Sequence, residues 1–254
     1  MGCDIHMVVE RRSKGTWARV KPPEGFLDPS YRDLVEREPE NEYWLNAAKR
    51  SWYSGRNYVL FGVLADVRNG VGFAGIDTGN AVTPISLPRG FPDDMSEGAR
   101  ALLGDNRYDD DGDDSLDDIW LGDHSFSWLT LDELLAYDWD HGALRRGVVS
   151  LEDFEARVNE HGQSLPLRAD SHPYDHWSGA ISGRGISTIS ALEALSLAQN
   201  GGIVAKDDER LHVRDEWVIP LRKQVSDFID EVMPELEKLA PNPSDVRIVF
   251  GFDS

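Results

Sequence analysis

The chain begins MGCDIHMVVE (residues 1–10), a stretch with the character of a β-strand. Side chains alternate between the two faces of a strand, so Asp4 and His6 would point one way and Cys3 and Ile5 the other. A carboxylate and an imidazole side by side can bind a divalent metal ion or move a proton. The first strand therefore predicts one edge of a polar site.

The rest of the chain predicts an α+β fold around that strand. Residues 3–20 have the pattern of a β-hairpin, because two extended segments flank the turn-forming sequence SKG (13–15). The C-terminal segment VRIVFGF (246–252) is strand-like and is a candidate to pair with the first strand. We predict a single α+β domain over 1–254, in which a mixed or antiparallel sheet includes this hairpin and the C-terminal strand. Several packed helices and long ordered loops complete it.

Capping patterns and breakers indicate the helix boundaries. Thr130 followed by Glu133 is a capping box, which places a helix start. Asp93 or Asp94 is a candidate N-cap for an earlier helix, and Gly70 offers a stop for a buried one. Helices are also predicted over 42–50, 55–70, 151–160 and 188–199, and from Pro220 onward with a kink at Pro234.

Composition narrows the class of protein. The chain has 254 residues, of which 40% are hydrophobic, so it is long enough to bury a substantial core. No apolar run approaches the roughly 18 to 20 residues of a membrane span, and no signal peptide is predicted. Cys3 is the single cysteine, which excludes an intramolecular disulfide and fits a reducing cytoplasm. We therefore expect a cytoplasmic protein, and the oligomeric state stays open.

The net charge of −20 limits the classes of molecule that the protein is expected to bind. It argues against sequence-independent binding to extended DNA or RNA, which needs a cationic face, and it would repel anionic membranes. A local cluster of arginines could still bind a small anion. The expected partner is thus a small anionic or nucleotide-like molecule, with no extended nucleic acid and no membrane.

The chain resembles a family of uncharacterised proteins found in tailed bacteriophages and bacterial prophage regions. The segments that carry the resemblance run from end to end: MGCDIH (1–6), RNY (56–58), ADVRN (65–69), PRGFPDD (88–94), HSFSWLTLDEL (124–134) and VRIVFGFDS (246–254). The resemblance implies a virus-encoded accessory protein that acts in the cytoplasm of an infected or lysogenic bacterium. It implies nothing about chemistry.

Polar residues in these segments are the candidates for a site. Asp4, His6 and His124 are predicted as catalytic groups, or as ligands of a divalent metal ion whose identity stays open. Ser125 would bind a phosphate with His124, if both lie at the start of the capped helix. The alternative is that Asp4 and His6 are satisfied by neighbouring side chains and that His124 and Ser125 only lead into the helix.

The other predicted ligand-binding residues are arginines and their neighbours. Arginine forks suit phosphate and carboxylate groups, and in an acidic protein they also form plain salt bridges. The candidates are Arg56, Asn57, Tyr58, Arg68, Arg89 and Trp128, the last of which could instead be a core anchor.

The densest charge lies in GDNRYDDDGDDSLDD (104–118). It does not fit the calcium-binding EF-hand pattern, because Arg107 falls at the first ligand position. A loop that gathers Asp109, Asp111 and Asp113 around one cation and a solvated acidic loop both remain open.

Three functions are compatible with these features. The first is hydrolysis of a small phosphorylated or nucleotide-like substrate, assisted by a metal ion or by acid–base groups. The second is a non-catalytic protein that sequesters a nucleotide signal of host antiviral defence. The third is an acidic protein that inhibits a host enzyme. Added salt would weaken its binding to that enzyme.

Overall fold

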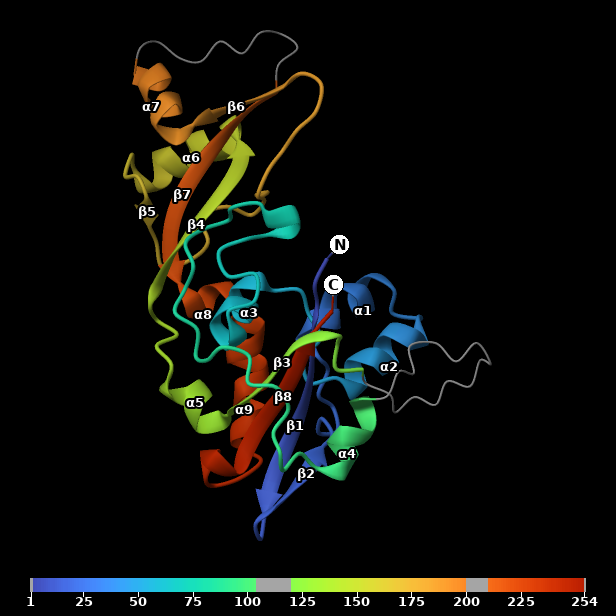
Figure 1. The fold of residues 1–254 in the computed structure, drawn as a ribbon. Helices are drawn as coiled ribbons and strands as arrows, with labels where there is room; N and C mark the ends of the chain where they lie inside the picture. The colour runs from blue at the N-terminus through green and yellow to red at the C-terminus, as the bar shows by residue number, and fades with distance from the viewer. Residues whose placement is uncertain (1, 104–119, 200–209, 254) are drawn as a thin grey trace. The chain divides into compact units, whose positions relative to one another are not determined.

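The computed structural model describes residues 2–103, 120–199 and 210–253 (Figure 1). Its fold is α+β, as predicted, with two sheets whose strands are mostly antiparallel. Contacts divide the chain into two compact units. The first unit comprises Met1–Val67, Thr83–Tyr137 and Val225–Ser254, and the second comprises Arg68–Val82 and Asp138–Gln224. The single domain over 1–254 stays a prediction.

The sheet of the first unit has the strand order β2-β1-β8-β3. Its strands are β1 (Ile5–Ser13), β2 (Thr16–Val20), β3 (His124–Thr130) and β8 (Val246–Phe252). The predicted hairpin is confirmed as β1 and β2, and the predicted pairing of the N- and C-terminal strands is confirmed as antiparallel β1 and β8. Every residue of β8 is buried, which fits its place between two other strands.

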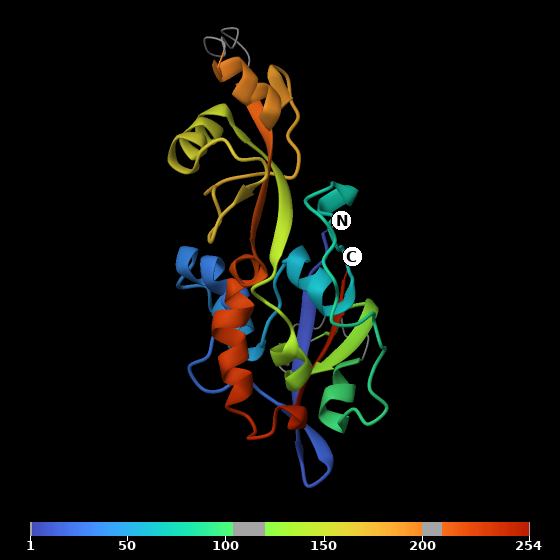
Figure 2. The same ribbon diagram turned by 90° about the vertical axis from the view of Figure 1, so that its left-hand side faces the viewer.

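Helices cover both faces of this sheet (Figure 2). They are α1 (Arg32–Arg37), α2 (Glu42–Arg50), α3 (Tyr58–Ala65), α4 (Glu97–Arg100), α5 (Leu131–Ala136), α9 (Met233–Glu237) and a π-helical turn, η4 (Asp227–Val232). Short 3-10 turns lie at Pro29–Tyr31, Ala101–Leu103 and Pro243–Asp245. Val8 and Val249 pack with Ala99 of α4 on one face. On the other face, Phe252 lies edge-on to Phe61 of α3 at 4.9 Å.

The second unit is built on the long strand β7 (Arg210–Pro220). It pairs with β4 (Gly142–Ser150) in antiparallel fashion and with β5 (Leu167–Arg168) and β6 (Ile186–Ser190) in parallel. Its helices are α6 (Leu151–His161), α7 (Ala191–Gln199) and α8 (Leu221–Gln224), with a 3-10 turn at Phe73–Gly75. Trp217 lies in a core to which α6 and α7 both contribute.

Several predicted boundaries are right. The capping box at Thr130 and Glu133 is present at the start of α5. Helix α2 has the predicted bounds, and α6 begins after Ser150, whose hydroxyl accepts a hydrogen bond from the Asp153 amide. These starts were predictable because each rests on a side chain that caps its own helix locally.

Other predicted boundaries are wrong. Helix α3 ends at Ala65 rather than near Gly70, because Asp66 takes a left-handed conformation (φ 58°) as its C-cap. Ser96, and neither Asp93 nor Asp94, is the N-cap of α4. Residues 188–190 belong to β6, so α7 begins at Ala191.

The last predicted helix also differs from its prediction. Pro220 ends β7 instead of opening a helix, and the segment that follows is divided into α8, η4 and α9. Pro234 stands in the first turn of α9, directly after the π-helical turn η4, so the helical conformation changes next to this proline.

No helix among residues 2–103, 120–199 and 210–253 has both the length and the apolar character of a membrane span. The acidic stretch with Asp109, Asp111 and Asp113 lies outside the described residues.

Candidate functional site

The two ends of the described chain meet at one end of the first sheet, where the N and C labels lie together in Figures 1 and 2. The cause is the strand register. Phe252, the last residue of β8, pairs with Ile5 on one side and with His124 on the other. Residues next to these three positions are therefore brought around Asp253, although they come from opposite ends and the middle of the sequence.

Asp253 joins this end of the sheet to the first strand. Its Oδ1 accepts a hydrogen bond from the Asp4 amide at 2.7 Å, and its own amide donates to the Asp4 carbonyl at 3.1 Å. Its Oδ2 lies 3.2 Å from Nε2 of His6. Because a carboxylate accepts, Nε2 of His6 carries the proton in this contact, and Nδ1 is the basic nitrogen of the neutral ring. Asp253 thus orients His6.

His124 reaches the same residue from β3. Its Nε2 lies 3.3 Å from the backbone carbonyl oxygen of Asp253, and its Nδ1 lies 2.9 Å from Oγ of Ser125. The carbonyl oxygen can only accept, so Nε2 is the protonated nitrogen of the neutral ring and Nδ1 accepts from the Ser125 hydroxyl. The backbone at Asp253 therefore selects the tautomer of His124 that can take a proton from Ser125.

Neighbouring side chains on a strand normally point to opposite faces, and a local distortion brings His124 and Ser125 together. Ser125 has a positive φ of 52°, an uncommon conformation for a residue other than glycine. The pairing of β3 with β8 shifts register between His124 and Ser127. Such bulges re-aim side chains, and strained backbone of this kind is concentrated at functional sites.

Arg56 adds a cation to the site. Its Nε and Nη2 each donate to one carboxylate oxygen of Asp4 at 2.8 Å, and these hydrogen bonds raise the pKa of Arg56. A Cβ atom at Gly2 would lie 2.3 Å from Cζ of Arg56, so a larger residue there would displace the guanidinium from this position. The first residues of the chain thus position Arg56, whose side chain is 54% exposed.

Two aromatic rings border the histidines. The ring of Trp120 lies 5.1 Å from that of His6, and the ring of Phe252 lies 6.1 Å from that of His124. The His6 side chain is 18% exposed, and Ser125 and His124 are also partly exposed. A small molecule can therefore reach these groups from solvent. We call Asp4, His6, Arg56, His124, Ser125 and Asp253 the terminal site.

Four of the predicted ligand-binding residues have structural roles elsewhere in the first unit: Asn57, Tyr58, Arg89 and Trp128. Asn57 is the N-cap of α3 and accepts hydrogen bonds from the Val59 and Leu60 amides. Tyr58 begins that helix, with its ring 5.5 Å from that of Phe61. The structure does not add these residues to the terminal site.

Arg89 forms two hydrogen bonds with Glu133, at 2.6 and 3.0 Å, and lies over the Trp128 ring at 5.1 Å. Burial opposes ionisation of Glu133, but Arg89 and the Thr130 amide outweigh it and lower the pKa of that carboxyl. Arg89 and Trp128 thus support the start of α5. Arg68 belongs to the second unit and is not counted with the site.

His124 and Ser125 precede the capped helix in the sequence, but both lie in β3 and α5 begins only at Leu131, so they do not lie at its N-terminus. The predicted metal ligands Asp4, His6 and His124 are brought to one end of the sheet. In the described part of the chain, however, no three His, Cys, Asp or Glu residues form a group that could hold a metal ion. A metal ion at this site stays a prediction.

Sequence reasoning missed Asp253 and Trp120. Asp253 could have been found, because it directly follows a strand predicted to pair with the first one, which places it near Asp4. Trp120 follows the acidic stretch, and no local pattern connects it with His6.

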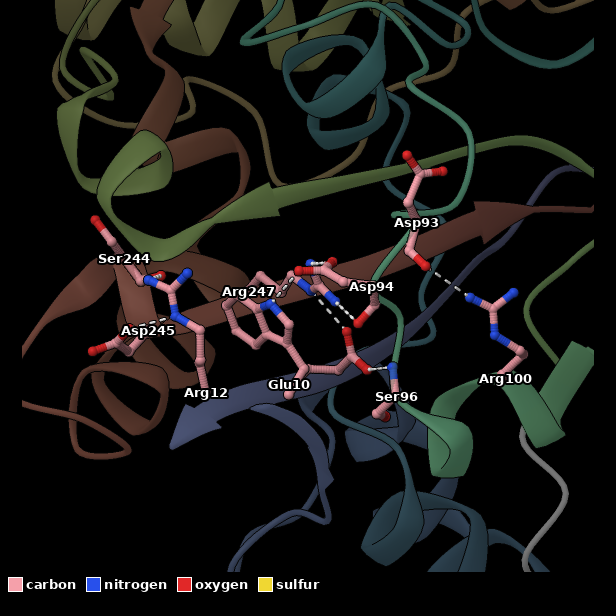
Figure 3. Close-up of polar contacts among 10 residues, drawn as sticks. Glu10, Arg12, Asp93, Asp94, Ser96, Arg100, Ser244, Asp245 and Arg247 are labelled. Atoms are coloured by element: carbon pink, nitrogen blue, oxygen red, sulfur yellow. Dashed lines mark hydrogen bonds and ion pairs between the residues drawn. The ribbon is translucent and has the colours of Figure 1, made fainter. Parts of the chain in front are cut away.

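A second polar group lies on the same strands, beside α4 (Figure 3). Glu10 and Arg247 are cross-strand partners with 0% and 2% exposed surface, and Nε of Arg247 donates to Glu10 at 2.7 Å. The Ser96 amide donates to the other Glu10 oxygen, and Arg247 also donates to Asp94. The Trp17 ring lies 4.0 Å from the guanidinium carbon. We call these five residues the buried network.

Neither the models of known protein families, nor curated proteins, nor solved structures gave a match to this chain. The resemblance to a phage and prophage family therefore stays a prediction.

Proposed function

We propose that the protein hydrolyses a small phosphorylated, nucleotide-like substrate at the terminal site, with Ser125 as the nucleophile. The supporting observation is the chain of contacts from Ser125 to His124 and on to the Asp253 carbonyl. A serine hydroxyl is a weak nucleophile until an adjacent base takes its proton, and a base works best when a third group orients it.

In the first step, Oγ of Ser125 attacks the phosphorus atom and its proton passes to Nδ1 of His124. A bond forms between Oγ and phosphorus, while the bond from phosphorus to the leaving oxygen breaks. His6 enters this step as the imidazolium, with a proton on each nitrogen, and gives its Nδ1 proton to the leaving oxygen. Because Nε2 of His6 contacts Asp253, it is Nδ1 that faces the substrate.

In the second step, water attacks the phosphorus atom of phosphorylated Ser125. Nδ1 of His6, now unprotonated, takes a proton from the water. The bond between Oγ and phosphorus breaks, and His124 returns its proton to Oγ. The two steps together consume one water molecule, release the leaving alcohol and phosphate, and restore both histidines.

Arg56 supports phosphate as the group transferred. Two of its nitrogens bind Asp4, and the third, Nη1, has no hydrogen-bond partner among the described residues. A guanidinium held in this way can bind a phosphoryl oxygen without first being ordered. The net charge of −20 disfavours an extended polyanion, so the substrate is expected to be small.

The test is turnover on a panel of nucleotides and phosphomonoesters, measured for the wild type, Ser125→Ala and Ser13→Ala. Ser13 is an exposed serine at the far end of β1 and serves as the matched control. We expect Ser125→Ala to lower kcat about 1,000-fold or more, because it removes the nucleophile, and Ser13→Ala to have no effect.

Each assay is repeated with EDTA and with added Mn, Mg or Zn. Turnover that survives EDTA supports acid–base chemistry by the terminal site alone. Turnover that EDTA abolishes and a metal ion restores supports the predicted metal site at Asp4, His6 and His124. Binding of an intact nucleotide without cleavage would overturn the hydrolase proposal in favour of sequestration.

A further inference from the structure

Arg145, on β4 of the second unit, is a cation without a counterion. Its side chain forms no ion pair and no hydrogen bond with any described residue, although the chain carries 46 acidic residues against 26 basic ones. Its guanidinium carbon lies 5.3 Å from the centre of the Trp177 ring. A guanidinium with five N–H donors and only an aromatic face beside it is open to an anionic ligand.

The next residue along β4 uses the acids of this region. Side chains alternate along a strand, so Arg146 points to the opposite face from Arg145. Its three nitrogens donate to Glu216, Asp77 and Asn80 at 2.7 to 3.2 Å. The acids near β4 therefore neutralise one arginine and leave the other unpaired.

Burial makes the missing counterion of Arg145 costly. The side chain is only partly exposed, and burial lowers the pKa of Arg145 to about 10. No acidic neighbour in the described part of the chain acts in the opposite direction. The guanidinium is still charged at neutral pH, so an anion bound to it would offset this desolvation.

The aromatic ring beside Arg145 is held firmly. Val148 of β4 and Ser178 exchange two backbone hydrogen bonds, at 2.7 and 3.0 Å, which fix the loop that carries Trp177. Trp177 lies edge-on to the buried Trp217 at 5.5 Å. A Cβ atom at Gly147 would lie 2.7 Å from atoms of both rings, so a larger residue there would displace them. The site is thus built before any ligand arrives.

His172 borders the same ring. Its imidazole stacks on Trp177 at 5.8 Å, with 19° between the planes. The Tyr174 backbone contacts Nδ1 of His172, and within the described ranges Nε2 has no hydrogen-bond partner. Burial lowers the pKa of His172, and the charge of Arg145 adds to the effect. The imidazole is therefore neutral at pH 7, and Arg145 supplies the positive charge.

These features indicate the kind of anion. One guanidinium matches one negative charge, and a net charge of −20 penalises every further charge on a ligand. A planar carboxylate accepts two parallel hydrogen bonds from a guanidinium. The rings of Trp177 and His172 are at least partly exposed and suit an aromatic body, since aromatic rings pack favourably with one another.

We propose that Arg145 binds the carboxylate of a small aromatic acid, whose ring packs against Trp177 and His172. This proposal is independent of the hydrolase proposal, because the two sites share no residue.

The test is an NMR titration of the full chain with benzoate. It follows the indole N–H signal of Trp177, which Trp177→Phe identifies by its loss. We expect the signal to shift to saturation in the wild type, and Arg145→Gln to weaken benzoate binding about tenfold or more, because the charge and the fork are removed. Benzamide has the same shape without the charge and should bind at least about tenfold more weakly than benzoate.

Arg168→Gln is the matched control. Arg168 is exposed on β5 of the same unit, and its replacement changes the net charge equally. It pairs in register with Val218, the neighbour of Trp217, so its side chain lies on the other face of the sheet. Binding of benzoate by this control should equal that of the wild type.

Arg145→Lys decides the matter if Arg145→Gln does not fold. It keeps the charge and loses the fork, so binding should weaken about threefold or more. Absence of a benzoate-dependent shift in the wild type overturns the proposal. Unchanged binding by a folded Arg145 variant, equal weakening by Arg168→Gln, or equal binding of benzamide overturns it as well. Tighter binding of inorganic phosphate than of benzoate would overturn the choice of a carboxylate.

Discussion

The terminal site and the buried network lie on the same strands, yet their polar groups are used differently. In the buried network, Glu10 and Arg247 are almost fully buried, and Arg247 has partners on Glu10, Asp94 and the face of Trp17. In the terminal site, four residues earlier along β1, His6 stays partly exposed and Nδ1 has no partner in the described part of the chain.

The difference separates a group that stabilises the fold from one that is open to a ligand. Burial of charge is tolerated only when partners satisfy it, and the buried network meets that condition through four elements. At the terminal site, Asp253 fixes the orientation of His6 and the tautomer of His124. Nδ1 of His6 and Nη1 of Arg56 are left available to a ligand. Three changes test this distinction, in order of decreasing effect.

The largest effect is expected from Arg247→Met in the buried network. It leaves the Glu10 carboxylate buried without its cation, so the free energy of unfolding should fall by about 3–5 kcal/mol. Arg12→Met is the control, because Arg12 also pairs with an aspartate but is 39% exposed, and it should cost less than about 1 kcal/mol. Urea denaturation measures both, and equal losses would remove the distinction between the two kinds of pair.

A smaller and different effect is expected from Asp253→Asn in the terminal site. The amide no longer holds the Nε2 proton of His6, so kcat should fall about 100-fold, while stability changes by less than about 1 kcal/mol. Asp245→Asn is the matched control, because Asp245 has a similar exposure and pairs with Arg12 outside the site. If Asp253→Asn lowered stability as much as Arg247→Met does, the terminal site would be structural.

The smallest effect concerns the rim of the buried network. The hydrogen bond from Arg247 lowers the pKa of Asp94 below its ordinary value of 3.8. The folded protein therefore binds fewer protons there than the unfolded chain, so this pair stabilises the fold above that pH and the contribution is lost as the pH falls through the lowered pKa.

Asp94→Asn should thus be less stable than the wild type at neutral pH. The difference should stay below about 1 kcal/mol, because the Asp94 side chain is 65% exposed and solvent screens the pair. Denaturation over a series of pH values should show the two proteins converge as the pH falls below 3.8. A difference that grew towards acid would contradict this assignment.

The sequence allowed the fold class, the hairpin and the pairing of the terminal strands to be predicted, because strand character and turn residues are local features. It also allowed Asp4, His6, Arg56, His124 and Ser125 to be chosen. It did not distinguish Glu10 from His6, since both lie on the same face of one strand. Only the tertiary contacts with Ser96 and Arg247 show that Glu10 is buried and has hydrogen-bond partners for its carboxylate.

The chemistry of the terminal site was beyond sequence reasoning for a similar reason. His124 and Ser125 are adjacent in the chain, and a regular strand would separate their side chains. Their hydrogen bond depends on the positive φ of Ser125 and on the irregular pairing with β8. The tautomer of His124 depends on the carbonyl of Asp253, 129 residues away in sequence.

The most direct measurement is intact-protein and peptide mass spectrometry after rapid acid quench of the wild type with a substrate that it turns over. We expect a mass increase of one phosphoryl group, located on Ser125 and lost in Ser125→Ala. Turnover by the wild type with no phosphoryl group on Ser125, together with undiminished kcat in Ser125→Ala, would contradict the proposed role of the terminal site.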